Sequence, residues 1–163
     1  MMAKFIRRWM PVLAAGLAAP LLRAAPAPAD PAEIAVVAHA SVPVNSLTFA
    51  NLRQILLGDR QYWSSDLKVI LLVGAPASRE REVLLKTVYQ MTEAQFRQYW
   101  ISKVFRAEAS SGPRVVFSAE EAASMVNATA GTIAFVDASR VPKGAKLLRI
   151  DGKVPGETGY RLR

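Results

Sequence analysis

The sequence predicts an α/β domain whose mixed, mostly parallel sheet is flanked by helices. Three observations support this prediction. Short apolar runs, typical of buried strands, alternate with segments of helical periodicity. Turns that contain Gly or Pro separate these segments, and Ser or Thr stands before several helical segments in the position of an N-cap. The chain has 163 residues and no cysteine, so a single hydrophobic core must hold it without disulfides.

The apolar runs place the strands. We expect buried strands at residues 34–39, 67–73, 132–136 and 145–150, with a brief strand or extended connector at 114–118. Residues 59–66 read as a polar turn that carries Tyr62 and Trp63, two aromatic residues expected to cover one end of the core. The stretch after residue 150 is rich in glycine and predicts no element.

Cap residues and periodicity place four helices. The first begins at Ser46 or Thr48, ends at Gly58, and presents on one face Leu47, Leu52, Ile55 and Leu56. The second runs from Ser78 to about residue 90. The third follows the capping-box pattern Thr92–Gln95, and the fourth runs from Ser118 to about residue 128. Three aromatic residues of the third helix predict a stripe that faces the core: Phe96, Tyr99 and Trp100.

The amino terminus carries the pattern of a secretory signal peptide. Basic residues precede an apolar run at 10–22, and small residues follow it, so cleavage after Ala27 or Ala29 fits the A-x-A rule. A membrane anchor is the alternative, but the run is shorter than the roughly 20 residues that span a bilayer. We expect residues 1–29 to be a signal peptide, residues 30–163 to form one domain, and the mature protein to be periplasmic.

The charge balance limits the class of partner. Loss of residues 1–29 removes four cations and no acid, and the formal net charge falls from +8 to +4. Such a surplus favours anionic partners but does not amount to the basic stripe of a nucleic-acid-binding domain. We therefore expect no nucleic acid as a partner.

The turn at residues 74–79 is the first candidate for a binding site. In parallel sheets, ligands bind beyond the carboxyl ends of the strands, next to the amino ends of helices, where free N–H groups and the helix dipole favour anions. Ser78 would supply a hydroxyl and Arg79 a charge. The alternative is an ordinary N-cap followed by a solvated arginine. The turn at Ser118 is a second candidate of the same kind.

The motifs, in their order and spacing, resemble the phosphate-type periplasmic substrate-binding proteins of ABC transporters. The resemblance spans roughly residues 34–150. Its motifs are Ile34-Ala-Val-Val, Pro43-Val-Asn45, Leu52-x-x-Ile55-x-x-Gly58 with Trp63, Ser78-Arg-Glu80, and Ala130-Gly-Thr-Ile-Ala-Phe-Val136. It implies a periplasmic-binding-protein-like (type II) domain that is truncated relative to the two-lobed family. It also implies a phosphate-like oxyanion as ligand, an ABC permease or other membrane partner, and a monomer.

Carried over residue by residue, the resemblance points to one loop and a second loop facing it. The family's phosphate loop reads Arg, a short gap, then Gly-Ser-Gly-Thr. Here Ser78 stands at the Thr position, Ala77 keeps a small residue, Pro76 replaces the Ser, and Leu72 replaces the Arg. Ser41 and Asn45 would line the facing loop, although plain turn chemistry also accounts for them. The implied ligand-binding residues are Ser78, Arg79, Ala77, Ser41 and Asn45.

Catalytic and metal chemistry find no support in the sequence. His39 is the only histidine and there is no cysteine, so a zinc set is not expected. No Gly-x-Ser-x-Gly elbow is present for a hydrolase. We expect no enzyme, no catalytic residue, no metal and no cofactor. Three hypotheses remain in order: an exported oxyanion-binding protein that serves a transporter, a non-transport binding or adaptor module of the same fold with a degraded pocket, and, far behind, an enzyme.

Overall fold

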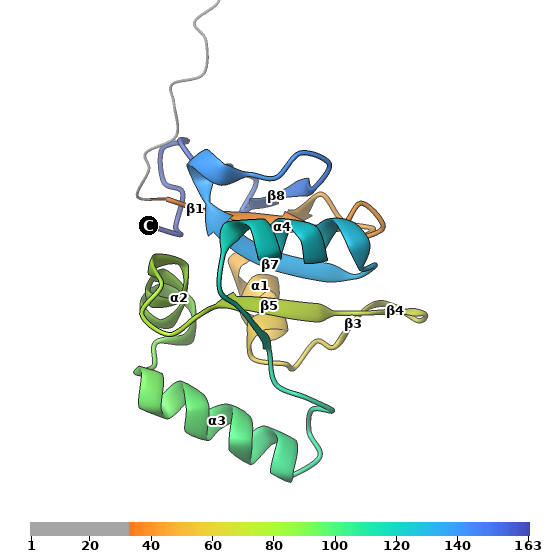
Figure 1. Cartoon of the computed structure of the whole chain (residues 1–163), viewed down its shortest axis with the longest axis vertical. Coiled ribbons are helices and arrows are strands. Elements are labelled where there is room, and N and C mark those ends of the chain that lie inside the picture. Colours follow the sequence, from red (N-terminus) through yellow and green to blue (C-terminus); the bar gives the residue numbers. More distant parts are fainter. Residues whose placement is uncertain (1–32) are drawn as a thin grey trace, which may run out of the picture.

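A six-stranded sheet forms the centre of the molecule (Figure 1). The computed structural model describes residues 33–163, so the expected signal peptide and its cleavage site lie outside the described residues. The strands of the sheet are β1 (Ile34–Ala38), β2 (Ser46–Leu47), β5 (Ile70–Gly74), β6 (Arg114–Val116), β7 (Thr132–Asp137) and β8 (Lys146–Ile150). They lie in the order β2-β8-β1-β7-β5-β6. A separate two-stranded ribbon joins β3 (Tyr62–Ser64) to β4 (Leu67–Lys68).

The sheet is mixed and mostly parallel, as the sequence predicts. β1 runs antiparallel to both of its neighbours, β7 and β8. β5 pairs in parallel with β7 and with β6, and β2 pairs in parallel with β8. The carboxyl ends of five strands therefore share one edge of the sheet, whereas β1 ends at the opposite edge. The direction of each strand decides at which edge of the sheet the loop after it lies, and so which loops can be neighbours.

Helices cover both faces of the sheet. One layer contains α1 (Phe49–Leu56), α2 (Arg79–Leu84), its continuation as the π-helix η1 (Leu85–Tyr89), and α3 (Glu93–Phe105). The other contains α4 (Ala119–Ala128), and the short 3-10 helix η2 (Ala138–Arg140) follows β7. Ile34 and Val36 pack with the first layer, and Ala35 packs with the second. Because β1 is buried on both faces, its sequence is continuously apolar rather than alternating.

The cap residues are those expected from the sequence. The side chains of Thr48, Ser78, Thr92 and Ser118 each accept the backbone N–H of the residue three positions later. Thr92 and Gln95 complete a reciprocal capping box. These bonds satisfy donors that a helix cannot satisfy internally, which is why the four helix starts could be located from sequence.

Two segments near the first helix differ from the expectation. Leu47 pairs with Ile150 in β2 and does not belong to the helix. Residues 59–66, predicted as a polar turn, contain β3, and the apolar run predicted as one strand at 67–73 is divided between β4 and β5. Trp63 accounts for the ribbon, since its side chain is buried and its Nε1 donates to the Gly131 carbonyl at 2.8 Å.

The glycine-rich tail, for which the sequence predicted no element, closes the core. Tyr160 and Leu162 are buried. The Tyr160 hydroxyl donates to the Ile34 carbonyl at 2.6 Å, and the Ile34 N–H donates to the Leu162 carbonyl at 2.8 Å. The beginning and the end of the described chain therefore lie side by side at one edge of the sheet (Figure 1).

The third helix is only partly covered. Phe96 and Trp100 are buried, as expected for a stripe that faces the core, and Tyr99 is half-buried. Ile101, which directly follows Trp100, and Phe105, the last residue of the helix, are exposed at 64% and 90%. Within residues 33–163, no helix combines the length and the apolar character that crossing a bilayer would require.

Candidate functional site

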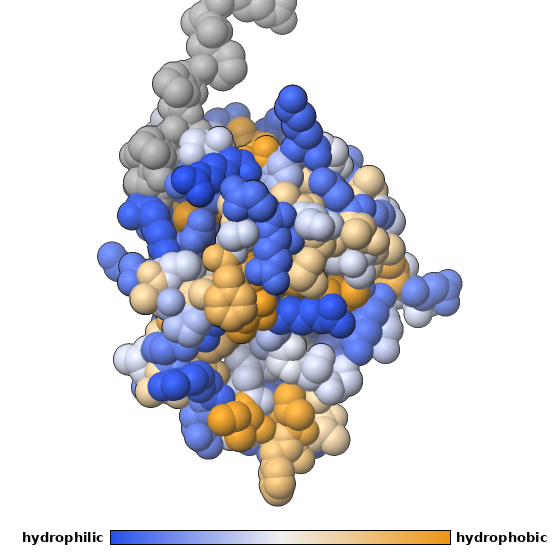
Figure 2. All heavy atoms as spheres, viewed as in Figure 1, coloured by the Kyte–Doolittle hydropathy of each residue, from blue (hydrophilic) through white to orange (hydrophobic). Residues whose placement is uncertain are grey.

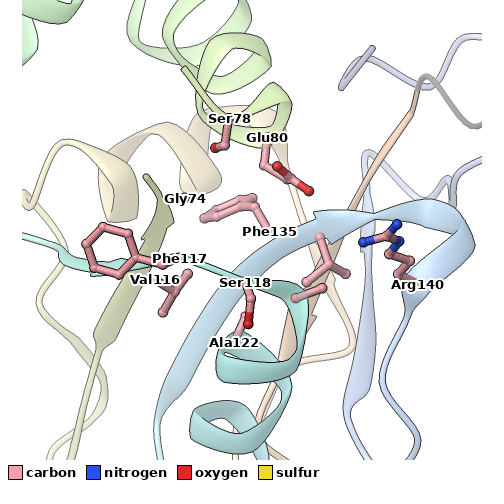
Figure 3. A pocket seen from close by; sticks show the side chains of 11 residues that line it. Gly74, Ser78, Glu80, Val116, Phe117, Ser118, Ala122, Phe135 and Arg140 are labelled. Atoms are coloured by element: carbon pink, nitrogen blue, oxygen red, sulfur yellow. The ribbon is translucent and has the colours of Figure 1, made fainter. Parts of the chain in front are cut away.

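The amino ends of α2 and α4 converge on one pocket at the edge of the sheet where five strands end. The pocket holds about 200 Å³. Ser78 and Glu80 enter it from α2, Ser118 from the start of α4, and Arg140 from η2, while Phe135 lies at its floor (Figure 3). The two turns that the sequence suggested as separate candidates therefore form a single site.

The turn before α2 is built around a close contact. A Cβ at residue 74 would lie 2.2 Å from Ser78 Oγ, so any residue other than glycine would displace the hydroxyl that caps α2. Ala77 adopts a left-handed conformation with φ 64°, which a non-glycine residue occupies at a cost of about 1 kcal/mol. Ser78 Oγ then accepts the N–H of Arg81 at 3.3 Å. The other N–H groups of this first turn have no acceptor inside the helix, and they give the pocket its donor side.

Arg81 is the arginine that the structure buries behind this turn. Its Nε and Nη2 donate to the two carboxylate oxygens of Glu93 at 2.8 and 2.7 Å. Its Nη1 donates to the Gly74 carbonyl at 3.1 Å, and its guanidinium lies over the Phe96 ring at 4.6 Å. The charge of Arg81 is therefore neutralised by Glu93, and its hydrogen bond to the Gly74 carbonyl holds the turn in place. It does not line the pocket.

The start of α4 carries its own carboxylates. Glu121 accepts the Phe117 N–H at 2.7 Å. The pKa of Glu120 is lowered because its carboxylate accepts its own backbone N–H and the Ser118 hydroxyl, with the charge of Arg140 adding to the effect. Ser118 therefore opens a helix whose positive end is already partly compensated.

Positive charge reaches the site from the segment after β7. The side chain of Arg140 lines the pocket. Burial works to raise the pKa of Asp137, but hydrogen bonds from the Ser139 hydroxyl and N–H, together with the charges of Arg140 and Arg79, lower it below its ordinary value. The lowered pKa favours the ionised carboxylate of Asp137, so this side chain offsets part of the positive charge of the two arginines. Glu80 adds a second negative charge inside the pocket itself.

The structure brings only some of the expected site residues together. Ser78 lines the pocket, Ala77 belongs to the same turn and is exposed, and Arg79 follows it on the exposed side of the helix. Ser41 and Asn45 are not brought to this turn. Ser41 accepts the Gly131 N–H at 3.3 Å at the opposite edge of the sheet.

The reason for this separation is the direction of β1. The facing loop follows β1, and β1 alone runs against the other strands, so its carboxyl end lies away from the pocket. Asn45 precedes β2, which lies two strands from β1 on the side away from β7, and its carbonyl accepts the Arg149 N–H at 3.0 Å. Propensity and periodicity do not reveal strand direction, so the sequence could not exclude this loop.

Sequence reasoning missed Arg140 and Glu80 as pocket residues. A signal for Arg140 existed, because it follows a predicted strand, and ligands of open α/β sheets generally lie beyond the carboxyl ends of strands. Glu80 gave no such signal, because an acidic residue in the first turn of a helix is already explained by the helix dipole. Among residues 33–163, no group of three or more His, Asp or Glu side chains is placed to hold a metal ion.

Solved structures with the same fold match the described domain. Neither a family model nor a curated protein matches the sequence. An ABC-type phosphate transport receptor from Vibrio cholerae superposes with a TM-score of 0.60 at 18% identity, over 76% of this chain and 48% of that chain. A Clostridium perfringens protein solved with bound phosphate gives 0.59 and 18%, over 74% and 45%. PstS from Borrelia burgdorferi gives 0.56 and 17%, over 76% and 49%.

These likenesses confirm the fold that the motifs implied. The chain has the fold of phosphate ABC transporter substrate-binding proteins, and it spans about half the length of the solved proteins it matches.

Proposed function

We propose that this chain is an exported solute-binding domain that holds a small phosphate-like oxyanion in the pocket between α2 and α4. The observation that carries the proposal is the convergence of two serine-capped helix starts and the Arg140 guanidinium on one pocket of about 200 Å³. Helix starts supply N–H donors and a positive dipole end, and arginine adds a charged fork suited to oxyanions.

The proposed ligand is bound by few groups. Pro76, at the position of the family's Ser, has no N–H to donate. Arg81, the arginine just behind the turn, forms an ion pair with Glu93 and is not available to a ligand. Glu80 opposes an anion in the pocket. We therefore expect a dissociation constant of about 100 μM or weaker, roughly −5.5 kcal/mol.

Delivery to a membrane transporter and residence in the periplasm belong to the same proposal. They are supported by the signal-peptide pattern of residues 1–29 and by the phosphate transport proteins that share the fold. Amino-terminal sequencing of the periplasmic fraction tests export: a start at Pro28 or Asp30 supports it, and intact Met1 in the membrane fraction contradicts it.

One observation favours a second function. Carboxylates stand at both helix starts, Glu80 in the pocket and Glu120 at the first turn of α4. A pocket that repels anions fits a non-transport adaptor module of the same fold. No catalytic step belongs to either proposal.

Titration calorimetry of residues 30–163 with phosphate, sulfate and molybdate decides between the two. Binding that weakens as salt is raised, and that drops in Arg140→Gln, supports the oxyanion site, because exposed charges are screened over about 8 Å at physiological salt. Arg149→Gln is the matched control, since Arg149 is an exposed arginine on β8. Absence of binding by all three anions favours the adaptor, and loss in both variants contradicts the assignment to this pocket.

A further inference from the structure

A second cavity lies at the opposite edge of the sheet from the α2–α4 pocket. It holds about 210 Å³ between the beginning of β5 and the segment 109–114 that leads into β6. We propose that this cavity and the apolar groove beside it form a binding site for an amphipathic anion, with its charged head in the cavity and its apolar chain on α3.

Three cations and no carboxylate line the cavity. The cations are Arg60, Lys68 and Arg114. None of them forms an ion pair with a residue of the described chain, whereas five other cations in it do. Like charges that share a cavity without a counter-charge repel one another, and an anion placed among them removes that repulsion.

The groups that contact these cations are neutral, so the positive charges remain available to a bound anion. Lys68 Nζ donates to the Ser110 hydroxyl at 2.6 Å. Arg60 Nε donates to the Tyr62 carbonyl at 3.3 Å, and the Arg60 guanidinium lies 5.8 Å from the centroid of the Trp63 ring. The Arg114 side chain makes no hydrogen bond or ring contact within residues 33–163. The hydroxyls of Ser110 and Ser111 add neutral groups that can donate to a bound oxyanion.

An apolar groove continues directly from this cavity. Trp100 and Gly112 line both the cavity and the groove, and the groove is completed by Ile101, Val104 and Phe105. Figure 2 shows the corresponding hydrophobic surface at the lower end of the molecule, over α3. Phe105 is 90% exposed, so this surface stays in contact with water unless a ligand covers it.

The two halves of the site select one class of occupant. Inorganic phosphate would satisfy the cations but leave the groove exposed. A second copy of the chain would cover the groove but bring the same unpaired cations toward one another across a two-fold axis. A molecule with an anionic head and an alkyl chain satisfies both halves. Ile101 and Phe105 are exposed at 64% and 90%, which leaves the groove open to a membrane surface, so we take an anionic lipid of that surface as the occupant.

Octyl phosphate is the direct probe. In calorimetric titration of residues 30–163, we expect octyl phosphate to bind at least tenfold more tightly than inorganic phosphate and than octyl glucoside, which has the chain without the charge. Equal affinity for octyl phosphate and octyl glucoside would overturn the role of the cations. Equal affinity for octyl phosphate and phosphate would overturn the role of the groove.

Matched variants assign the binding to this site. Arg114→Gln and Phe105→Ser should each weaken octyl phosphate at least fivefold, while Arg140→Gln and Phe117→Ser should leave it unchanged. Phe117 is a suitable control because it is 78% exposed and lines the α2–α4 pocket. Unchanged affinity in either test variant, with its melting temperature preserved, would overturn the proposal.

Vesicles identify the source of the amphiphile. Co-sedimentation with vesicles of phosphatidylcholine and phosphatidylglycerol (4:1), lost in Arg114→Gln, supports a lipid surface. Octyl phosphate binding without co-sedimentation would overturn the lipid surface as the source and indicate a free amphiphile. The result is independent of the oxyanion site, because its controls alter that site and its test variants do not.

Discussion

Arg81 and Glu93 join the start of α2 to the start of α3 through two parallel hydrogen bonds of 2.8 and 2.7 Å. The Arg81 side chain is 5% exposed and that of Glu93 is 33% exposed. The pair lies directly behind the turn at residue 74, whose carbonyl receives the third hydrogen bond of the guanidinium. The Arg81 charge, although it lies next to the turn of the candidate site, therefore stabilises the fold.

Arg81→Met should therefore destabilise the domain. The variant leaves the Glu93 carboxylate and the Gly74 carbonyl without their donor, and removing one partner of a largely buried pair costs about 3 kcal/mol. Urea unfolding measures the change. Arg81→Met combined with Glu93→Leu should recover part of the loss, and a single variant as stable as the parent would contradict the structural role.

Glu80→Gln should strengthen oxyanion binding. The substitution removes a negative charge from the pocket and keeps the size of the side chain. A charge about 4 Å away contributes on the order of 1 kcal/mol in water, or roughly fivefold in affinity. Calorimetry at low salt checks the gain. Glu82→Gln, on the exposed side of the same helix turn, is the control, and weaker binding in Glu80→Gln would refute the pocket geometry.

Ser78→Asp should separate capping from ligand binding. Aspartate is as good an N-cap as serine, so the unfolding free energy should change by less than about 0.5 kcal/mol. Any oxyanion binding should fall, because the added carboxylate stands beside the ligand. Parallel unfolding and calorimetry measure both effects. Undiminished binding in this variant would rule out the α2 start as the site.

Stability should fall at alkaline pH through Lys103. Burial works to lower the pKa of Lys103, but hydrogen bonds to Asp59 at 2.5 Å and to the Tyr99 hydroxyl at 3.1 Å raise it above its ordinary value of 10.5. A raised folded-state pKa means that the stabilisation is complete below pH 10.5 and is lost as the pH rises through the folded-state pKa.

The measurement compares the parent with Lys103→Met by urea unfolding from pH 8 to pH 12. The difference in unfolding free energy should narrow above pH 10.5. The comparison also cancels the effect of Tyr89, whose pKa burial raises, because the variant retains that residue. A difference that stays constant over this range would contradict the contribution of the Lys103 charge.

Much of the fold could be predicted from sequence because its signals are local. Thr92 and Gln95 cap each other within one turn, and the continuously apolar run 34–38 identifies a strand buried on both faces. The tail could not be predicted, because Tyr160 is held by Ile34, 126 positions away. Such contacts leave no periodic trace in the sequence.

The residues of the candidate site also fall into two groups, those with a local sequence signal and those whose role depends on tertiary packing. Ser78 and Ser118 were found as caps, and the rule that ligands lie beyond strand ends placed both at one edge of the sheet. The roles of the nearby arginines depend on packing. Arg81 is buried by Glu93 and Phe96, while Arg140 reaches the pocket, and nothing in the residues beside them distinguishes the two.

The position of β1 also governs when the chain can fold. The earliest strand of the described chain sits in the middle of the sheet, and its partners are among the last to be made: Ile34 pairs with Asp137, and Val36 pairs with Leu148. Closing such long loops must precede any central pairing, which slows folding. A chain that is synthesised amino end first therefore leaves β1 without its partner strands until β7 and β8 have been made, so the central pairs of the sheet form late.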